Sequence, residues 1–341
     1  MSQALPHLSR SRYLAAGIVL LALLLLAIAL LSLAVGARAI PLGEVIDTLL
    51  NPEATGTNAT IMRDLRLPRT LLGLVVGAAL GLSGAIMQGV TRNPLADPGL
   101  LGIHAGAALF VVLGIALLGL ASLTAYVWLG FLGAAMATII VYAVASLGRE
   151  GATPVKLALA GAAVTAAFSS VTSGILLTNA VTLDAFRFWQ VGSLAGRGND
   201  ILFGVTPFLA LGIVLALITG RLLDAMALGD DIARGHGQRV MLSRALAAVA
   251  WIILSGGATA ALGPIAFVGL IVPHAARAIT GPSYRWILPY SALLAPILLL
   301  GADIVGRVVA PPGELQVGIV TAAIGAPLFV LLVRRRRLAE L

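Results

Sequence analysis

The stretch RLPRTLLGLVVGAALGLSGAIMQGV, residues 66–90, places a long apolar run directly behind two arginines and a proline. The run from Thr70 to Val90 contains no charged residue, and about 20 such residues are enough to cross a bilayer as a helix. Its glycines and alanines are small enough to let neighbouring helices approach closely in lipid. We therefore expect a packed transmembrane helix that starts near Pro68, since proline is tolerated at the first helical position.

The composition extends this expectation to the whole chain. Of the 341 residues, 60% are hydrophobic and only 11% are charged, and the mean hydropathy is +1.04. A water-soluble domain of this size could not cover its surface with so few charges. Barrel strands would need an alternating pattern that this sequence lacks. The absence of cysteine excludes disulfides, thiolate metal sites and cysteine nucleophiles. The sequence predicts an all-α polytopic membrane protein, with residues 1–341 forming a single transmembrane domain.

Ten apolar runs are separated by proline, glycine and charge clusters. They cover residues 14–36, 70–90, 99–120, 123–147, 157–178, 201–220, 243–261, 264–280, 286–306 and 316–333. The seventh and eighth runs are the weakest pair, because little more than Leu-Gly-Pro joins them. The first run is too long for the apolar core of a signal peptide, so we count it as a span.

The distribution of charge tests the direction of these spans. If both termini are cytoplasmic, 15 of the 22 basic residues fall on the cytoplasmic side, where membrane proteins concentrate them. The other seven lie outside, and they are Arg38, Arg63, Arg66, Arg69, Arg187, Arg197 and Arg307. The asymmetry favours ten spans with both ends inside. It also leaves the two arginines around Pro68 on the side that the charge rule disfavours, which is a first indication of function.

Two loops are long enough to hold further structure. Residues 37–68, outside, are predicted to carry a surface helix around PLGEVIDTLL. Residues 226–240, inside, predict a short helix with Asp230 and Asp231 in its first turn and glycines at its end. This inner segment is either a solvated connector or a knob that inserts into the groove of a partner.

Two apolar segments broken by proline and glycine lie in the two halves of the chain, NPLADPGLLG (93–102) and GPIAFVGLIVPH (263–274). Broken helices at matching places are typical of inverted-repeat transporters. The first segment is either a tight cytoplasmic turn or a constriction in which Asn93 and Leu95 project into a pathway. Non-helical backbone inside a membrane needs protein or a water-filled cavity around it. Spacing alone favours the turn.

The sequence holds no evident catalytic constellation. Its four histidines are scattered, without a second ligand at helical spacing. Asp303 and Arg307 are four residues apart and so share one helix face, either as a neutralised ion pair or as a functional group. The only lysine, Lys156, is not part of a glycine-rich phosphate loop. ATP would therefore have to be used by a separate subunit.

The outer segment LDAFRFWQVGSLAGRGND (183–200) mixes aromatic and cationic residues. We expect Phe186, Phe188 and Trp189 to belong to an interfacial aromatic belt. The two arginines of the segment have no such explanation.

Several motifs together resemble one family. They are RLPRTLLGLVVGAALGLSGAIMQ, NPLADPGLLGIHAG, FRFWQVGSLAG, LGDDIARGHG, GPIAFVGLIVPHAAR, ADIVGR and GELQVGIVTAAIGAPLFVLLVRR. From about residue 40 to the C-terminus they are similar, in order, to the signatures of FecCD-type permeases. These are the membrane subunits of type II ATP-binding cassette (ABC) importers for iron-siderophores, haem and cobalamin. The resemblance implies a ten-helix subunit of the type II ABC importer permease fold.

The same resemblance implies an assembly. A second permease subunit, either a copy of this chain or a paralogue, would complete a dimer around a central pathway. Two ATPase subunits would lie on the cytoplasmic side, and a periplasmic or lipid-anchored substrate-binding protein would dock outside.

Site residues are implied as well. Arg66, Arg69 and Arg307 match the positions at which arginines of the family meet acidic residues of the binding protein. The segment 226–237 matches the coupling helix that enters the ATPase groove, with the matching residues Leu228, Gly229, Asp230, Asp231, Ala233, Arg234, Gly235, His236 and Gly237. His236 stands where the family has an apolar residue. The cytoplasmic gate matches Asn93, Leu95 and Thr153.

These expectations combine into one function. The chain is predicted to be the permease subunit of an ATP-driven importer in the inner (cytoplasmic) membrane, which moves a ferric siderophore into the cytoplasm by alternating access. Its motifs look most like the ferric-enterobactin type. No cofactor is expected in this chain, and ATP and Mg would be used by the partner ATPase. Direct iron coordination is not expected, since no cluster of suitable ligands is present, and neither is a nucleic-acid partner.

Other functions remain open. Haem or cobalamin import by the same family is the nearest alternative. An ion-coupled secondary transporter would use Asp303 as its titrating carboxylate, but an arginine four residues away leaves that group poorly placed to cycle protons. A membrane enzyme is weaker still, for lack of catalytic residues.

Overall fold

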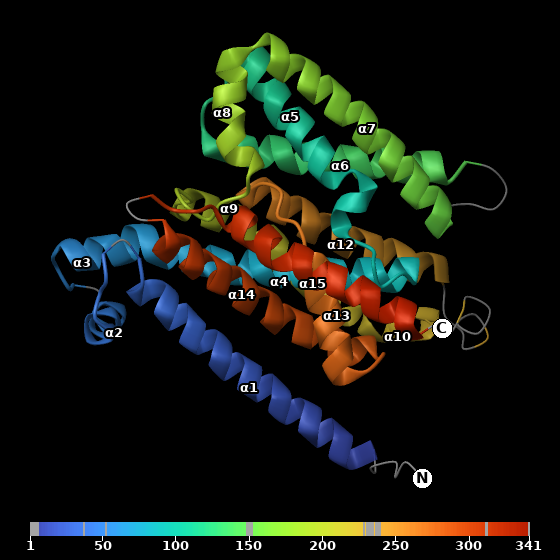
Figure 1. Cartoon of the computed structure of the whole chain (residues 1–341), viewed down its shortest axis with the longest axis horizontal. Helices are drawn as coiled ribbons and strands as arrows, with labels where there is room; N and C mark the ends of the chain where they lie inside the picture. Colours follow the sequence, from blue (N-terminus) through green and yellow to red (C-terminus); the bar gives the residue numbers. More distant parts are fainter. Residues whose placement is uncertain are drawn as a thin grey trace.

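A computed structural model describes residues 7–36, 38–51, 53–147, 153–227, 229, 235, 240–310 and 313–339 (Figure 1). The regular structure of these residues is entirely helical, which confirms the predicted all-α class. The helices are α1 (His7–Ala34), α2 (Leu42–Leu50), α3 (Thr57–Thr60), the π-helix η1 (Ile61–Arg66), α4 (Leu67–Thr91), the 3-10 helix η2 (Pro98–Leu101), α5 (Ile103–Leu118), α6 (Leu123–Ala145), α7 (Pro154–Thr178), α8 (Ala180–Gln190), α9 (Asn199–Ile218), α10 (Gly220–Ala227), α12 (Val240–Leu262), α13 (Val268–Thr280), α14 (Tyr284–Val309) and α15 (Val317–Ala339).

Each predicted apolar run coincides with one of these helices. Within the described residues, seven helices are long and apolar enough to cross a membrane, and α5, α13 and the apolar part of α15 are shorter. The weak pair of runs forms two separate helices, α12 and α13. In Figure 1, α1 begins and α15 ends at the same end of the bundle, as termini on one side require. The chain is thus a multi-pass membrane protein, and the count of ten crossings remains a prediction.

The helix that contains Pro68 begins earlier than the sequence predicts. The chain is helical without interruption from Thr57, through α3 and η1, into α4. Proline lacks an N–H, and its ring crowds the carbonyl four residues before it. The π-turn, in which the Leu67 N–H bonds to the Met62 carbonyl, widens the helix directly before this position. The helix therefore continues through Pro68, and the predicted start at this proline is wrong.

The helix predicted from residues 66–90 forms the centre of the bundle. α4 packs against α9, α12, α13 and α14. The apolar window of its helix is 78% buried, whereas that of α1, along the edge of the bundle, is 6% buried. Glycines permit this packing, because a Cβ at Gly77 would lie 2.5 Å from the backbone of Pro296, and one at Gly81 would lie 2.4 Å from the Ser291 carbonyl oxygen. Small residues bring the backbones into contact, as the sequence predicts.

The two broken segments meet inside this packed centre. η2 follows the turn 92–97, and α13 starts only at Val268, after non-helical residues. Pro98 packs against Gly269, which in turn lies against Gly84 of α4. The break after α4 is therefore more than a surface turn, because its continuation enters the bundle and contacts the break before α13.

Replacing Gly84 by alanine is expected to destabilise this contact. A Cβ here would lie 1.8 Å from the Gly269 carbonyl oxygen, so backbone would have to move. Overpacking of this kind costs about 2 kcal/mol. Unfolding of the detergent-solubilised chain by SDS measures the loss. Gly204→Ala is the control, because a Cβ there meets nothing within 4 Å; equal stability of the two variants would contradict the Gly84–Gly269 contact.

Candidate functional site

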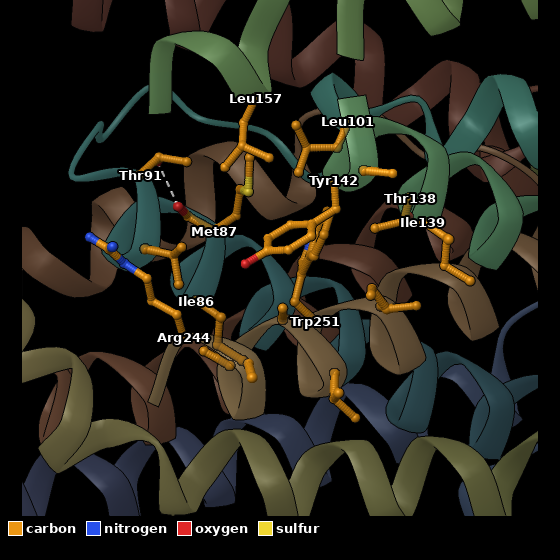
Figure 2. Close-up of a pocket in the computed structure, with 17 residues that line it drawn as sticks. Ile86, Met87, Thr91, Leu101, Thr138, Ile139, Tyr142, Leu157, Arg244 and Trp251 are labelled. Carbon is orange, nitrogen blue, oxygen red and sulfur yellow. Dashed lines mark hydrogen bonds between the residues drawn. The ribbon is translucent and has the colours of Figure 1, made fainter. Parts of the chain in front are cut away.

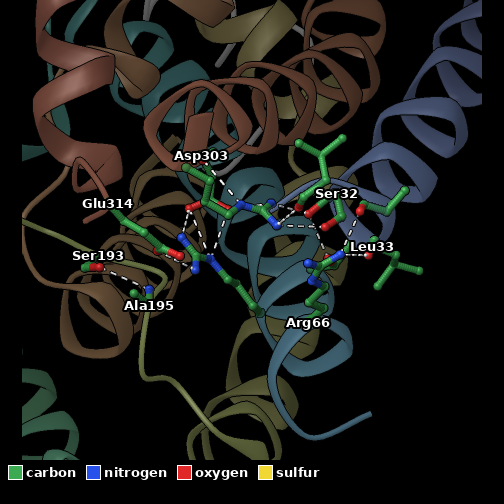
Figure 3. Close-up of polar contacts among 12 residues, drawn as sticks. Ser32, Leu33, Arg66, Ser193, Ala195, Asp303 and Glu314 are labelled. Carbon is green, nitrogen blue, oxygen red and sulfur yellow. Dashed lines mark hydrogen bonds and ion pairs between the residues drawn. The ribbon is translucent and has the colours of Figure 1, made fainter. Parts of the chain in front are cut away.

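Five charged residues gather at the outer end of the bundle, the end that carries the predicted outside loops (Figure 3). They are Arg66, Arg69, Asp303, Arg307 and Glu314, hereafter the outer network. Arg66 ends η1, Arg69 lies in the first turn of α4, and Asp303 and Arg307 lie on α14. The three arginines predicted to dock the binding protein are thus brought together, beside the end of α1.

Two of these arginines cap the last turn of α1. A helix leaves its final carbonyls without internal partners, and its C-terminus favours cations. Arg66 and Arg307 donate to these carbonyls and are only 6% and 4% exposed. Four accepting carbonyl oxygens, at 2.6–2.8 Å, belong to Leu33, Ala34, Ser32 and Val35. A fifth, that of Arg38, lies in the chain after the helix. Arg66 and Arg307 therefore hold the outer end of α1 in place.

Asp303 joins the other side of the outer network. Its carboxylate accepts from Arg69 Nη2 at 2.8 Å and Nε at 3.0 Å, and pairs with Arg307 Nη2 at 2.9 Å. Its side chain is 1% exposed. The predicted Asp303–Arg307 ion pair is confirmed. Both carboxylate oxygens of Asp303 are thus engaged by guanidinium groups, one by Arg69 and the other by Arg307.

Glu314 is the most exposed member of the outer network. Its Oε2 accepts from Arg69 Nη1 at 2.8 Å, and the side chains of Glu314 and Arg69 are 33% and 13% exposed. Arg66 and Arg307, by contrast, are covered. Docking at the three arginines remains a prediction. In this conformation an acidic partner would reach the outer network first at the Arg69–Glu314 pair.

Sequence reasoning missed three members of this site. Ser32 Oγ accepts from Arg307 Nη2 at 2.8 Å and shares a hydrogen bond of 2.9 Å with Thr70 Oγ1. Glu314, the partner of Arg69, is the third missed residue after Ser32 and Thr70. A serine inside the leucine-rich run of α1, and a glutamate directly before the last apolar run, are the signals that could have identified them.

At the inner end, the turn after α4 holds two predicted gate residues. Asn93 Oδ1 accepts from the Leu95 N–H at 3.0 Å, and the Asn93 carbonyl accepts from the Ala96 N–H at 3.0 Å. The Asn93 side chain thus shapes the turn. Thr153 caps α7, where its Oγ1 accepts from the Lys156 N–H at 3.4 Å. Among the described residues, no hydrogen bond joins Thr153 to this turn, so the gate role of all three stays a prediction.

Arg92 connects this turn to the predicted coupling segment. It adopts a left-handed conformation with φ 51°, and its Nε donates to the carbonyl of Met226 at 2.9 Å. Met226 is the first residue of segment 226–237. Of the predicted coupling residues, the structure describes Gly229 and Gly235; the ones outside the described residues are Leu228, Asp230, Asp231, Ala233, Arg234, His236 and Gly237. The turn and the start of the coupling segment are nevertheless directly bonded.

Helix α8 corrects one interpretation of the outer segment. Phe186 and Trp189 are 0% and 2% exposed and stack with ring centroids 5.6 Å apart, because α8 packs against α5. The expectation that they form an interfacial belt is wrong, and only Phe188 is exposed. Arg187 forms a surface ion pair with Asp184 at 3.1 Å.

Arg197 lies in the loop between α8 and α9. Its Nε donates to the Ser193 carbonyl at 3.3 Å, and burial lowers the pKa of its guanidinium to about 10. The group therefore stays charged at neutral pH and holds its own loop.

An apolar cavity of about 420 Å³ opens between α4, α6, α7 and α12 (Figure 2). Met87, Tyr142 and Trp251 line it, and Arg244 stands at one edge. An apolar lining of this kind suits an apolar ligand rather than an anionic metal complex. The cavity is therefore a poor fit for an iron chelate.

Comparison with known proteins gives a consistent result. The model of the FecCD transport family matches residues 23–335. The ferric enterobactin transport system permease protein FepD of Escherichia coli (strain K12) is 46% identical over 316 residues, which cover 93% of this chain and 94% of FepD. The "Probable siderophore transport system permease protein YfiZ" of Bacillus subtilis (strain 168) is 48% identical over 281 residues, which cover 82% of this chain and 84% of YfiZ.

A solved structure shares the fold. It is an inward-facing conformation of a transporter assigned to the metal-chelate type of ABC transporters, with a TM-score of 0.82 at 28% identity. The match covers 94% of this chain and 99% of the solved chain.

Proposed function

The chain belongs to the FecCD transport family, and from this premise we propose that it is the permease subunit of an ATP-driven importer that carries a ferric-siderophore complex into the cytoplasm by alternating access. The observation that carries the proposal is the 46% identity to a ferric enterobactin permease across 93% of the chain. In this proposal the subunit lies in the cytoplasmic membrane, with both termini inside.

This subunit performs no catalysis in the proposed cycle. ATP and Mg²⁺ bind to separate ATPase subunits on the cytoplasmic side, and segment 226–237 enters their groove. The permease itself holds no cofactor. Its family is one of ABC transport permeases, which supports this division of labour.

A second permease subunit packs against α7 in this assembly. Only 22% of the apolar window of α7 is buried in the single chain. Its exposed face carries small residues at four-residue intervals, Ala162, Ala166, Ser170 and Gly174. Small residues let two helices approach closely within a membrane. The still more exposed α1, with 6% of its apolar window buried, presents leucines instead, which suit contact with lipid.

The two ends of the bundle have different tasks. Outside, the binding protein delivers its cargo at the outer network, where Arg69 is the least buried of the three arginines. Inside, movement of segment 226–237 reaches the turn 92–97 through the bond between Arg92 and Met226. From this turn the chain continues into the contact between Pro98 and Gly269, inside the bundle. The permease thus has a covalent and hydrogen-bonded route from its ATPase face to its interior.

Reconstitution in liposomes tests the proposed function. The permease is combined with its ATPase and binding-protein partners, and ATP hydrolysis and uptake of radiolabelled ferric siderophore are measured together. We expect the loaded binding protein to stimulate hydrolysis, and uptake to require both partners. A preference for haem or cobalamin would overturn the siderophore assignment, and uptake without the ATPase would overturn the importer class.

Arg92→Gln is expected to uncouple hydrolysis from transport. The variant loses the Nε donor that holds the turn to Met226. We expect the amount of cargo moved per ATP hydrolysed to fall roughly fivefold, the lower end of typical coupling between sites. The ratio is measured in the liposomes described above. Arg187→Gln, an exposed arginine of the outer face, is the control, and an unchanged ratio in Arg92→Gln would remove the coupling role.

A further inference from the structure

A hollow of about 540 Å³, lined by two arginines, lies at the inner end of the bundle, between the first turns of α1 and the start of α14. Arg10 and Ser11 line it from α1, and Ser283, Arg285 and Trp286 line it from α14 and its cap. The hollow is distinct from the outer network and from the predicted coupling segment. The functions assigned to those parts leave it unexplained.

The hollow is positively charged. Arg10 Nη2 donates to the Thr280 carbonyl at 3.2 Å, which fixes the guanidinium at the wall. Arg285 is 62% exposed, and its Nε lies 3.4 Å from a carboxylate oxygen of Asp224. Two guanidinium groups from helices far apart in sequence therefore face one space.

Asp224 offsets only part of this charge. Its carboxylate also accepts from the Ser283 hydroxyl at 3.0 Å and from the Tyr284 N–H, and so caps the start of α14. The hollow is left with two cations against one engaged carboxylate. An anion with several oxygens would neutralise the remaining positive charge and accept hydrogen bonds from both arginines, since guanidinium groups match the geometry of phosphate.

The surroundings indicate what carries that anion. The hollow lies at the membrane end where cytoplasmic arginines gather, and Trp286 has the amphipathic ring typical of the headgroup level. Leu14 also lines the hollow, and its carbonyl accepts a hydrogen bond from the Tyr290 hydroxyl at 2.9 Å. Beside it, α1 presents exposed apolar side chains, with Tyr13 at 73% and Leu20 at 67% exposure. A ligand here has its charge in the hollow and an apolar surface next to it.

We propose that the hollow binds the phosphate of an anionic phospholipid of the inner leaflet, held by Arg10 and Arg285, with the acyl chains lying along the exposed flank of α1. Basic pockets between transmembrane helices on the cytoplasmic side have the chemistry that recognises such headgroups. Dissolved phosphate would use the same two arginines but would gain nothing from the apolar flank.

The lipid also has a structural task. The outer end of α1 is held by Arg66 and Arg307. Its inner end is tied to the bundle by the bonds from Arg10 to Thr280 and from Tyr290 to Leu14. A phosphate that bridges Arg10 of α1 and Arg285 of α14 adds a third tie at this weaker end.

Lipid titration of the purified full chain tests the proposal. Phosphatidylglycerol or phosphatidylcholine is added in detergent, and bound lipid is quantified by native mass spectrometry. We expect phosphatidylglycerol to bind in preference to phosphatidylcholine. Each arginine contributes about fivefold to affinity, so Arg285→Gln should lose about fivefold and Arg10→Gln/Arg285→Gln roughly 25-fold.

Arg12→Gln is the matched control, because Arg12 lies on the same helix and is exposed, but does not line the hollow. This variant should bind like the unaltered chain. Wild-type affinity in the single and double variants would overturn the site, as would equal binding of both lipids. Displacement of phosphatidylglycerol by millimolar inorganic phosphate would overturn the lipid as the source of the anion. If the double variant does not fold, the single variant decides the outcome.

Discussion

Asp303→Asn is expected to lower the free energy of unfolding by about 4 kcal/mol, because removing one partner of a buried ion pair leaves the opposite charge without compensation. Asp303 is 1% exposed and lies 2.8 Å from Arg69 and 2.9 Å from Arg307. Asparagine keeps the size of the side chain and one acceptor, but not the charge. Glu314 still pairs with Arg69, so the buried guanidinium of Arg307 is the charge that loses its compensation.

SDS-induced unfolding, followed by tryptophan fluorescence, measures this loss. Asp184→Asn is the matched control. Asp184, like Asp303, pairs with an arginine on its own helix, here Arg187 three residues later, but the Asp184 side chain is 69% exposed. Exposed pairs contribute less than about 1 kcal/mol. If the two variants unfolded at the same SDS fraction, the outer network would carry no buried electrostatic stabilisation.

Arg69→Gln is expected to weaken association with the substrate-binding protein roughly 150-fold, the equivalent of about 3 kcal/mol for losing one partner of a close charge pair across an interface. Arg69, with 13% of its side chain exposed, is the least buried of the three docking arginines. The substitution leaves Asp303 paired with Arg307, so the fold should survive. Association is measured by surface plasmon resonance at several salt concentrations, and its salt dependence should become shallower.

Two further variants sharpen this test. Glu314→Gln frees Arg69 Nη1 from its internal partner and should accelerate association if an acidic group of the binding protein competes for Arg69. Arg187→Gln removes an outer arginine elsewhere and should leave association unchanged. Wild-type affinity and salt slope in Arg69→Gln would remove the docking role from this residue. Reversing the charge of Arg66 would be a poor test, because a carboxylate there would face the α1 carbonyls that Arg66 now binds.

Hydropathy predicted the helices well, and helix boundaries less well. The runs at residues 243–261 and 264–280 were resolved as two helices, because apolar length and the Gly-Pro break are local signals. The residues from Thr57 to Arg66 are too polar to indicate the first turns of the central helix. Pro68 suggested a helix start, but the π-turn before it allows the helix to continue through this proline. A hydrogen bond that shifts from four to five residues leaves no trace in composition.

The arginines show a different limit. Their charge on the outer side was evident from the sequence, and the spacing of Asp303 and Arg307 predicted their ion pair. Sequence alone could not reveal that Arg66 and Arg307 are buried against the end of α1, because their acceptors are backbone carbonyls, which have no residue signature. Likewise, Phe186 and Trp189 looked interfacial until α8 was found folded onto α5.

The capped end of α1 has a consequence for how the chain is made. α1 is synthesised before α14, so the bonds from Arg307 to the carbonyls of Ser32 and Val35 can form only after a further 275 and 272 residues have been made. At common rates of synthesis this interval is roughly 15–55 seconds. Until then, water and lipid headgroups must solvate those carbonyls. Insertion of the first helix and its final fixation are therefore separate events in the biogenesis of this permease, and a chain truncated before α14 would carry an N-terminal helix that never acquires its native end.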